Sequence, residues 1–333
     1  MAEELTDRPL VAVVGGDTLL ARELRELLSE SKPAPRVELI SAAADGAATL
    51  GEEDDEPVVM IPLAAESLEG AQVAFLAGSP ASSRRTLKVL PENGPVLVDL
   101  TGALEEQPQS RLRAPLAEPA GSAPESRIQV IAHPAAIAIA MLASGLGEVG
   151  TIRRMIAHVF EPASERGQKG LDELQRQTVG VLSFQKLPTD VFDAQLAFNM
   201  LARYGEEALE PLELVEQRLE RHLASLLAAY PAIPMPSLRL IQAPVFHGHS
   251  FSVWVEFEEN PGIAAIARVL EKAGLDVRVD EPPNNVGAAG QNGVSVGAIS
   301  VDHNCPRACW IWMVADNLRL AGENALAVAK ESL

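Results

Sequence analysis

The sequence predicts an α/β protein in which a doubly wound parallel sheet is followed by a second, α+β domain. Three observations lead to this fold class. Residues 10–14 (LVAVV) are continuously apolar, which is typical of a strand buried on both faces of a parallel sheet. A Gly-Gly turn and a run of leucines at helical spacing follow directly. Short apolar runs then alternate with helix-like segments as far as residue 132, whereas runs of strands dominate beyond residue 151.

The first half of the chain supplies most of the parallel sheet. Residues 82–89 read as a helix, and residues 105–127, which contain four prolines, read as a long surface connection. The second strand, 37–40, runs into residues 41–46, where no arginine is present to bind a ribose 2′-phosphate. The further strands expected are 58–62, 73–77, 96–100 and 128–134.

The second half mixes strands and helices. Residues 206–228 form an acidic amphipathic helix, which is usually a solvated face over a core and only in the minority of cases a partner surface. A terminal helix is expected from about Leu318. The predicted strands are 151–160, 238–246, 251–257, 294–302 and 309–316, with a helix at 262–274.

Composition excludes several classes of protein. The 333 residues carry a formal net charge of −19, which opposes binding to nucleic acid because phosphates need a basic surface. No run of 18 apolar residues occurs, and the first ten residues lack a basic segment followed by an apolar core. We therefore expect a cytoplasmic protein that binds no membrane.

The two cysteines, Cys305 and Cys309, are too few for a disulfide framework. Their C-x-x-x-C spacing is a poor zinc signature, and the six histidines are scattered along the chain. We expect no metal site, and we interpret the cysteines as small, partly buried residues.

The most informative stretch begins at His133-Pro134, where a buried helix should start near Ala135. A helix N-terminus gathers unpaired N–H groups, which stabilise a thiolate nucleophile or an anionic substrate. Residues 135–137 are Ala, Ala and Ile, and none of these side chains can attack, ionise or donate. The local structure is suited to a nucleophile that the sequence does not contain.

The turn after the first strand follows a dinucleotide-binding glycine pattern only in part. The three glycine positions are occupied by Gly15, Thr18 and Ala21, and Thr18 adds bulk where a pyrophosphate should approach the backbone. Asp17 adds a carboxylate beside the same place. Two interpretations remain: Asp17 or Thr18 is simply the helix N-cap, or some dinucleotide binding is retained.

Several segments together resemble aspartate-semialdehyde dehydrogenases, in that family's order and over nearly the whole chain. They are VAVVGGDTLLA, VDLTGAL, IAHPAAIAIA, ASERGQKGLDELQRQT, AFNM, QAPVFHGHSFSV, VGAISVD and ADNLR. The resemblance implies a Rossmann-type domain at 1–132, completed by a C-terminal helix at 317–333, and an α+β dimerisation domain at 133–316. It also implies amino-acid biosynthesis, in which aspartyl phosphate is reduced with NADP through a covalent thioester.

The resemblance also says which residues should do the chemistry. The family's Ala-Asn-Pro-x-Cys places the nucleophile at Ala136, and a methyl group cannot form a thioester. The substrate-positioning glutamine falls on Glu161 and the carboxylate-clamping arginine on Gln242. The phosphate-binding arginine falls on Glu105, and a substrate lysine lies near Glu216. These changes make the pocket less suited to an anionic substrate.

One catalytic position is retained, because His249, the family's general acid/base, still follows glycine in its Gly-His-Ser turn. Its alternative interpretation is a structural histidine kept by the fold. The resemblance implies NADP or NAD as cofactor, although the altered turn argues against binding. The cofactor residues that it implies are Gly15, Asp17, Thr18, Leu19, Leu20 and Asn317.

Two hypotheses of function follow. In the first, the chain is a catalytically inactive, dimeric binding or regulatory member of the family, similar to its degenerate Usg-type paralogues, and forms a homodimer or a heteromer with an active paralogue. In the second, it is an NAD(P)-dependent oxidoreductase on a less anionic carbonyl compound, with His249 as acid/base. A short-chain dehydrogenase is set aside because no lysine stands four residues after Tyr204 or Tyr230. Cys305 or Cys309 could replace the nucleophile only if one of them lies beside His249.

Overall fold

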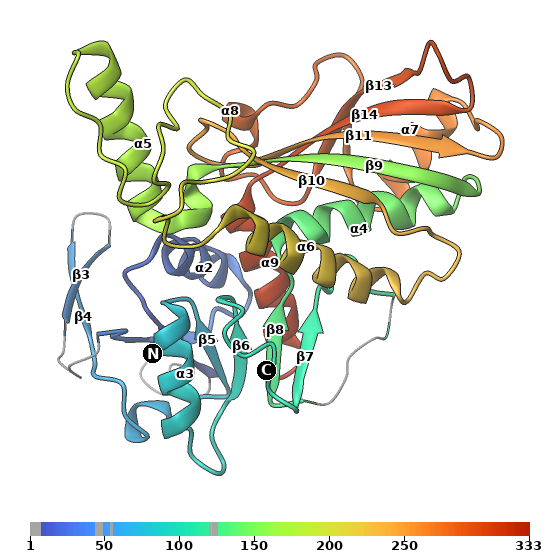
Figure 1. The fold of residues 1–333 in the computed structure, drawn as a ribbon. Coiled ribbons are helices and arrows are strands. Elements are labelled where there is room, and N and C mark those ends of the chain that lie inside the picture. The colour runs from blue at the N-terminus through green and yellow to red at the C-terminus, as the bar shows by residue number, and fades with distance from the viewer. Residues whose placement is uncertain (1–7, 44–48, 54–55, 120, 122–125) are drawn as a thin grey trace. The chain divides into compact units, whose positions relative to one another are not determined.

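The computed structural model describes residues 8–43, 49–53, 56–119, 121 and 126–333, and the remaining residues are not discussed. The segment 41–46 and the connection 105–127 therefore lie partly outside the described residues. The chain forms two compact units, each considered by itself (Figure 1). The first comprises Met1–Ala132 and Ala321–Leu333, and the second comprises His133–Leu320.

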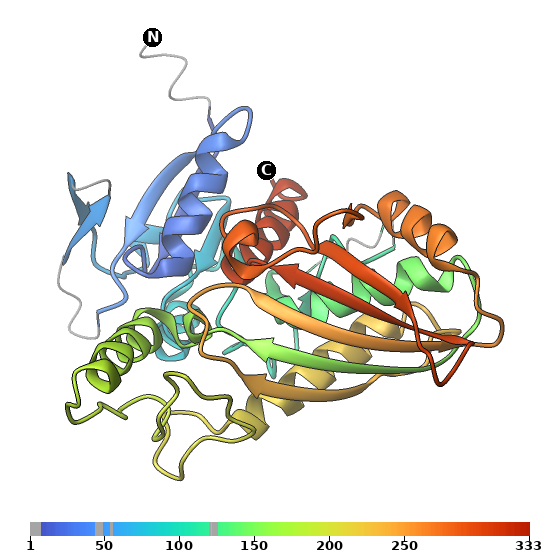
Figure 2. The same ribbon diagram turned by 90° about the horizontal axis from the view of Figure 1, so that it is seen from above.

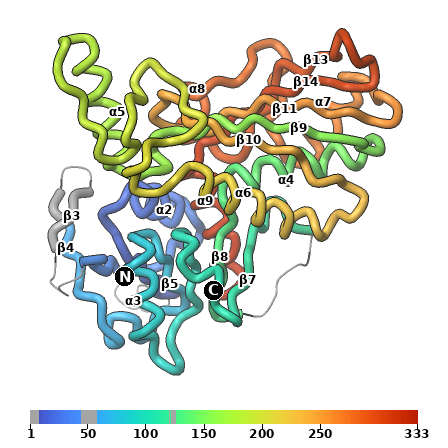
Figure 3. The backbone as a smooth tube through the Cα atoms, viewed as in Figure 1, coloured from blue at the N-terminus to red at the C-terminus, as the bar shows by residue number. Residues whose placement is uncertain are grey.

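The first unit contains a parallel sheet of six strands, as the sequence predicts. Continuous apolar runs form its centre, where every residue of β5 is completely buried. The chain can be followed from strand to strand in Figure 3. In spatial order the strands are β2 (Arg36–Ile40), β1 (Leu10–Val14), β5 (Val73–Leu76), β6 (Val96–Asp99), β8 (Ile128–Ile131) and β7 (Ser110–Arg113).

The order of strands reverses at β1, because the chain continues to β2 on one side and to β5 on the other. Ligands of doubly wound sheets bind at such a reversal, outside the carboxyl ends of the strands. Gly15 follows β1 with φ +88°, and a Cβ there would lie 2.3 Å from the Cα of Gly78, just after β5. Glycine is therefore required for the two loops to approach each other, whether or not a nucleotide binds.

Helix α2 (Leu19–Glu30) begins immediately after this turn. The Thr18 side chain accepts a hydrogen bond from the Ala21 N–H and donates one to the carbonyl of Ala77. Thr18 is therefore the N-cap residue of α2. Helix α3 (Pro80–Val89) begins with a capping box of Ser79 and Ser82, and a short 3₁₀ turn, η1 (Glu66–Leu68), precedes β5.

Two predictions about the first unit are wrong in part. Residues 105–127 do not form only a surface connection, since they contain edge strand β7, whose Arg113 is 1% exposed. Two carboxylates, Glu118 and Glu331, bind the Arg113 guanidinium and make its burial possible. The predicted strand 58–62 is β4 (Glu56–Met60), which pairs antiparallel with β3 (Thr49–Glu53) in a separate ribbon.

The second unit contains a mixed sheet of six strands, seen from above in Figure 2. Strand β12 (Asp276–Arg278) was not predicted, because three residues give no detectable pattern. The order is β10 (Ser237–Gln242), β9 (Ile152–Glu161), β11 (His249–Phe257), β14 (Ala308–Ala315), β13 (Ser295–Val301) and β12.

Three helices pack against one face of this sheet: α4 (Pro134–Gly147) on β9, α6 (Leu212–Leu227) on β10 and α7 (Ile263–Lys272) on β12 and β13. Helix α6 starts later than the predicted 206 because Pro211 occupies its N-cap. The remaining elements are η2 (Ala163–Arg166), α5 (Gly167–Leu182), α8 (Asn285–Ala288) and α9 (Asn317–Lys330).

The opposite face of the sheet carries partly exposed apolar side chains in register. Ile156 of β9 pairs with Trp254 of β11, which pairs with Trp310 of β14. Ile156 and Trp310 are 39% and 38% exposed, whereas their strand neighbours Ala157 and Ile311 are buried. Among the described residues, no helix has the length and apolar character that crossing a bilayer requires.

Candidate functional site

Helix α4 starts where the sequence predicts, with His133 at its N-cap and Pro134 in its first turn. The Ala135 N–H donates to His133 Nδ1 at 3.2 Å. Ala136 lies in the first turn and is completely buried, as are the apolar residues that follow it. The position that the resemblance assigns to a nucleophile therefore presents a methyl group enclosed by protein.

His133 itself was missed by sequence reasoning. It occupies the asparagine position of the family's Ala-Asn-Pro-x-Cys pattern, and that difference was the available signal. Its backbone N–H donates to Nδ1 of His222, which comes from α6, at 2.8 Å. This bond ties the start of α4 to a neighbouring helix and fixes where the imidazole of His133 lies.

His249 is the first residue of β11, paired with Ala315 of β14, rather than part of the turn before the strand. Its side chain is 1% exposed, and its ring centroid lies 5.6 Å from that of His133. Neither ring nitrogen of His249 has a hydrogen-bond partner among the described residues. A buried imidazole in this state is available to a ligand or a proton.

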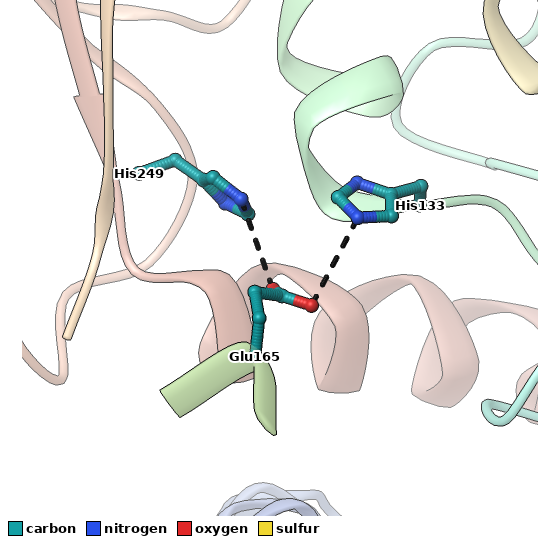
Figure 4. Close-up of side chains that lie close together, drawn as sticks. All are labelled: His133, Glu165 and His249. Atoms are coloured by element: carbon teal, nitrogen blue, oxygen red, sulfur yellow. Dashed lines mark ion pairs between the residues drawn. The ribbon is translucent and has the colours of Figure 1, made fainter. Parts of the chain in front are cut away.

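Glu165 of η2 lies between the two imidazoles (Figure 4). Its Oε1 atom is 3.8 Å from His249 Nε2, and its Oε2 atom is 3.9 Å from His133 Nε2. Both distances are too long for direct hydrogen bonds. The structure thus brings together three side chains from α4, η2 and β11, of which the sequence predicted only His249.

Asn317, a predicted cofactor residue, holds this cluster in place. Its Nδ2 donates to Glu165 Oε1 at 2.9 Å. Its Oδ1 accepts from the Ser164 hydroxyl and from the Gly248 N–H, at 3.0 and 3.1 Å. Asn317 therefore orients Glu165 and joins it to the residue before His249.

Both imidazoles are neutral near pH 7. Burial lowers the pKa of His133 well below its usual value, and the nearby His249 and Arg218 lower it further. Burial also lowers the pKa of His249, although Glu165 and Asp316 oppose this effect. Each ring therefore keeps an unprotonated nitrogen at neutral pH.

A buried ion pair lies close to this cluster. Arg166 donates to Glu161 Oε1 at 2.8 Å, and the two side chains are 9% and 0% exposed. Burial raises the pKa of Glu161 to about 7, against the attraction of Arg166. Glu161, Tyr204 and Glu210 raise the pKa of Arg166, so its guanidinium stays charged despite its burial.

Arg166 changes the interpretation of the pocket's charge. The family resemblance predicts an added carboxylate at Glu161 and a lost arginine at Gln242, but it does not reveal the Arg166 guanidinium that pairs with Glu161. The signal was Arg166 in FEPASER, directly after Glu165 and five residues after Glu161. The carboxylate added at Glu161 is thus balanced within the same unit.

Gln242 at the end of β10 is fully engaged with the protein. Its Nε2 donates to the carbonyls of Glu161 and Ala243, and its Oε1 accepts from the Tyr204 hydroxyl at 2.5 Å. The Tyr204 ring also lies 5.6 Å from the Arg166 guanidinium carbon. A side chain in this arrangement positions its neighbours and cannot clamp a substrate carboxylate as arginine does.

The other two predicted substrate positions lie elsewhere. Glu105 belongs to the first unit, where its carbonyl accepts from the Ser110 hydroxyl at 2.7 Å. Glu216 of α6 accepts from the Leu240 N–H at 2.6 Å and so connects its helix to β10. Among the predicted cofactor residues of the first unit, Leu19 and Leu20 are half-buried at the start of α2. Asp17 in the preceding turn is exposed.

Neither cysteine can serve as a displaced nucleophile. In the register of β11 and β14, His249 pairs with Ala315, whereas Cys309 pairs with Val255, six residues away. Six extended residues span about 20 Å. Cys305 lies beyond Cys309, before β14 begins. Burial also raises the pKa of the Cys309 thiol to about 12, which makes it unreactive.

Known proteins resemble this chain over almost its whole length. A USG-1 protein homologue from Pseudomonas aeruginosa is 29% identical over 316 residues, which cover 93% of each chain. The structure of a probable aspartate-semialdehyde dehydrogenase from the same species superposes with a TM-score of 0.83 at 27% identity, covering 98% of each chain.

A more distant structure, a Candida albicans aspartate-semialdehyde dehydrogenase with NADP, shares the fold, with a TM-score of 0.67 at 16% identity. It covers 97% of this chain and 98% of its own. The family model of the semialdehyde dehydrogenase dimerisation domain matches residues 144–320, more than half of the chain. The chain therefore belongs to the aspartate-semialdehyde dehydrogenase family, and its second unit carries that family's dimerisation domain.

Proposed function

We propose that this protein is a dimeric family member that does not catalyse the thioester-dependent reaction and acts by binding, as a regulatory partner of itself or of an active paralogue. The observation that carries the proposal is the buried Ala136 in the first turn of α4. Removal of a covalent nucleophile costs about 10⁶-fold in comparable enzymes. The cysteines are too far from His249 to replace it.

The substrate side of the pocket supports the same proposal. The carboxylate clamp is Gln242, which bonds to Tyr204 and to two backbone carbonyls. The Arg166 guanidinium is already bound to Glu161. An aspartyl phosphate would have to displace these contacts and would meet the Glu165 carboxylate as a like charge.

Dimerisation is supported by the match to the family's dimerisation domain and by the row of Ile156, Trp254 and Trp310 on the uncovered sheet face. Apolar area of this kind is typical of a subunit interface. Whether the partner is a second copy or an active paralogue is decided by mixing the purified proteins and measuring masses in sedimentation experiments.

The first test is a search for the covalent intermediate. The purified full-length chain is incubated with aspartate semialdehyde, phosphate and NADP, beside an active aspartate-semialdehyde dehydrogenase. We expect no NADPH above a mock preparation and no acyl adduct in the mass spectrum of the intact chain. Turnover, or an adduct mapped to any residue of this chain, would refute the proposal.

A second candidate function is an NAD(P)-dependent oxidoreductase without covalent catalysis. One observation favours it: His249 is a neutral, buried imidazole beside Glu165, as a general acid/base requires. The cofactor would bind at the reversal between β1 and β5, close to Gly15 and Thr18. Arg85 of α3 donates to the Ala42 carbonyl, just past the end of β2. A guanidinium at this place would bind the ribose 2′-phosphate that NADP has and NAD lacks, and so would favour NADP.

Calorimetric titration with NADP and NAD separates the two candidates. Saturable binding that is weakened by Arg85→Ala for NADP but not for NAD would support the oxidoreductase. If neither cofactor gives a heat of binding at millimolar concentration, the oxidoreductase hypothesis is refuted and the non-catalytic binding function is favoured.

A further inference from the structure

Three side chains that can bind a metal ion lie together, and only one of them, His249, is a position to which the family resemblance assigns a role. They are His133, Glu165 and His249, each offering one ligand atom, and these atoms lie within 4.8 Å of one another. We propose that this His-Glu-His cluster binds a divalent transition-metal cation and that the preferred cation is Zn²⁺. The proposal concerns this cluster and goes beyond the proposed binding function, and a ring nitrogen of His249 that binds a metal ion is not free to act as the acid/base of the second candidate function.

The spacing of the three atoms fits one shared ion. Three points at most 4.8 Å apart have a common centre no more than about 2.8 Å from each, and Zn–N and Zn–O bonds measure about 2.0–2.2 Å. Movements of no more than about 0.8 Å would bring the ligand atoms to that distance. Two imidazoles and one carboxylate form a donor set preferred by Zn²⁺, and they leave a coordination position for water or a ligand oxygen.

The side chains are held ready for this role. His249 is 1% exposed, and its two ring nitrogens lack partners among the described residues. His133 is 6% exposed, and its Nε2, which faces Glu165, also lacks a hydrogen bond within that part of the chain. Buried polar atoms are normally satisfied, and two of these three, the Nε2 atoms of His133 and His249, face the Glu165 carboxylate, which is the arrangement that a shared ligand requires.

A supporting hydrogen bond orients the carboxylate. Asn317 Nδ2 donates to Glu165 Oε1, and Asn317 Oδ1 is bound by Ser164 and by Gly248, the neighbour of His249. Metal-ligating side chains are usually fixed by such outer contacts. The outer contact here joins two of the three proposed ligands.

Charged groups of both signs act on the two imidazoles of the cluster. Arg166 is paired with Glu161 and Arg218 with Glu210, so neither guanidinium is left unbalanced. Asp316 is a further carboxylate that interacts with His249, beside the proposed ligand Glu165. The other described groups that act on the two imidazoles are the ring of His222 and the guanidiniums of Arg166 and Arg218.

Binding requires one change at His133. Because Nδ1 accepts from the Ala135 N–H, the neutral ring carries its proton on Nε2. Coordination through Nε2 moves that proton to Nδ1 and breaks the bond to Ala135. Metal binding should therefore shift the Ala135 amide resonance, and the broken bond should make the affinity roughly tenfold weaker than the ligand set alone would give.

The test uses full-length protein freed of metal with EDTA. Titration with Zn²⁺, in calorimetry and in competition with a chromogenic chelator, should give one site per chain. Co²⁺ should give a visible d–d spectrum of low-symmetry coordination, which adventitious surface binding does not produce. The Ala135 amide is followed in the same titration.

Four variants make the test specific. Glu165→Gln keeps the shape of the ligand, and His133→Asn restores the family residue, so both should fold, as circular dichroism checks. Each of these, and His249→Gln, should weaken Zn²⁺ binding at least 10- to 100-fold. His303→Asn changes an exposed histidine outside the cluster and should bind like the unaltered chain. Absence of saturable binding, or equal affinity in all four variants, would overturn the proposal.

Discussion

Arg166 and Glu161 form an ion pair of 2.8 Å inside the second unit, at the position where relatives are expected to hold a substrate. The acceptor carboxylate is completely buried, and the guanidinium stacks at 5.6 Å on Tyr204. The charged groups that a bound substrate would meet here are therefore already paired with each other.

Breaking this pair should be costly. Glu161→Gln leaves the buried Arg166 without its charge partner and should lower the free energy of unfolding by about 3–5 kcal/mol. The double variant Glu161→Gln with Arg166→Met removes both charges and should recover much of that loss. Urea denaturation measures both. The exposed pair of Asp276 and Arg278 is the control, since Asp276→Asn should cost only about 0–1 kcal/mol.

Restoring the nucleophile should not restore the reaction. In Ala136→Cys the thiol replaces a methyl group that is completely buried in the first turn of α4, and burial should raise its pKa as it does for Cys309. Iodoacetamide should therefore alkylate both buried thiols slowly, as peptide mapping can resolve, and NADPH formation from aspartate semialdehyde should stay at background because Gln242 cannot clamp the substrate. Measurable turnover from this single substitution would mean that the rest of the active site is intact. The added sulfur should destabilise the packed site by about 1–3 kcal/mol.

Stability should fall as the solution is acidified below about pH 6.5, the pKa of unfolded histidine. His133 and His249 have lowered pKa values in the fold, so the unfolded chain binds protons that the folded chain does not. Each contributes a loss of up to about 1.4 kcal/mol per pH unit until its folded pKa is reached. Glu161 acts oppositely between pH 7 and 4.5, because its folded pKa is raised.

Comparing two histidine variants isolates the contribution of His249 to the pH dependence of the free energy of unfolding. In the presence of EDTA, His249→Gln should reduce the acid-side slope of unfolding free energy against pH, whereas His303→Asn should leave it unchanged. An unaltered slope in His249→Gln would show that this imidazole is protonated equally in both states.

The uncovered sheet face should be the dimer contact. Trp310→Glu places a charge at the end of the row formed with Trp254 and Ile156 and should convert the dimer to a monomer in sedimentation velocity. Val59→Glu, at an exposed position of the first unit, is the matched control and should leave the mass unchanged. A dimer that survives Trp310→Glu would place the contact elsewhere.

The sequence by itself determined the local features of this protein. Apolar runs of four or five residues predict the strands of the parallel sheet, because such strands are buried on both faces. His133-Pro134 predicts the start of α4, because proline restricts the backbone of the residue before it. The family resemblance also identifies three positions at which this sequence differs from the family pattern, namely Ala136, Glu161 and Gln242. Short or polar strands such as β7 and β12 were missed, since tertiary pairing rather than local pattern stabilises them.

Only the tertiary structure decided which side chains meet. Glu165 lies between His133 and His249 although the three residues are far apart in the chain. The register of β11 and β14 places Cys309 opposite Val255, six residues along the strand from His249. The compensation of Glu161 by Arg166 likewise depends on both side chains being buried together. Such contacts arise from packing between elements distant in sequence, and their energies depend on burial, which no local pattern of residues encodes.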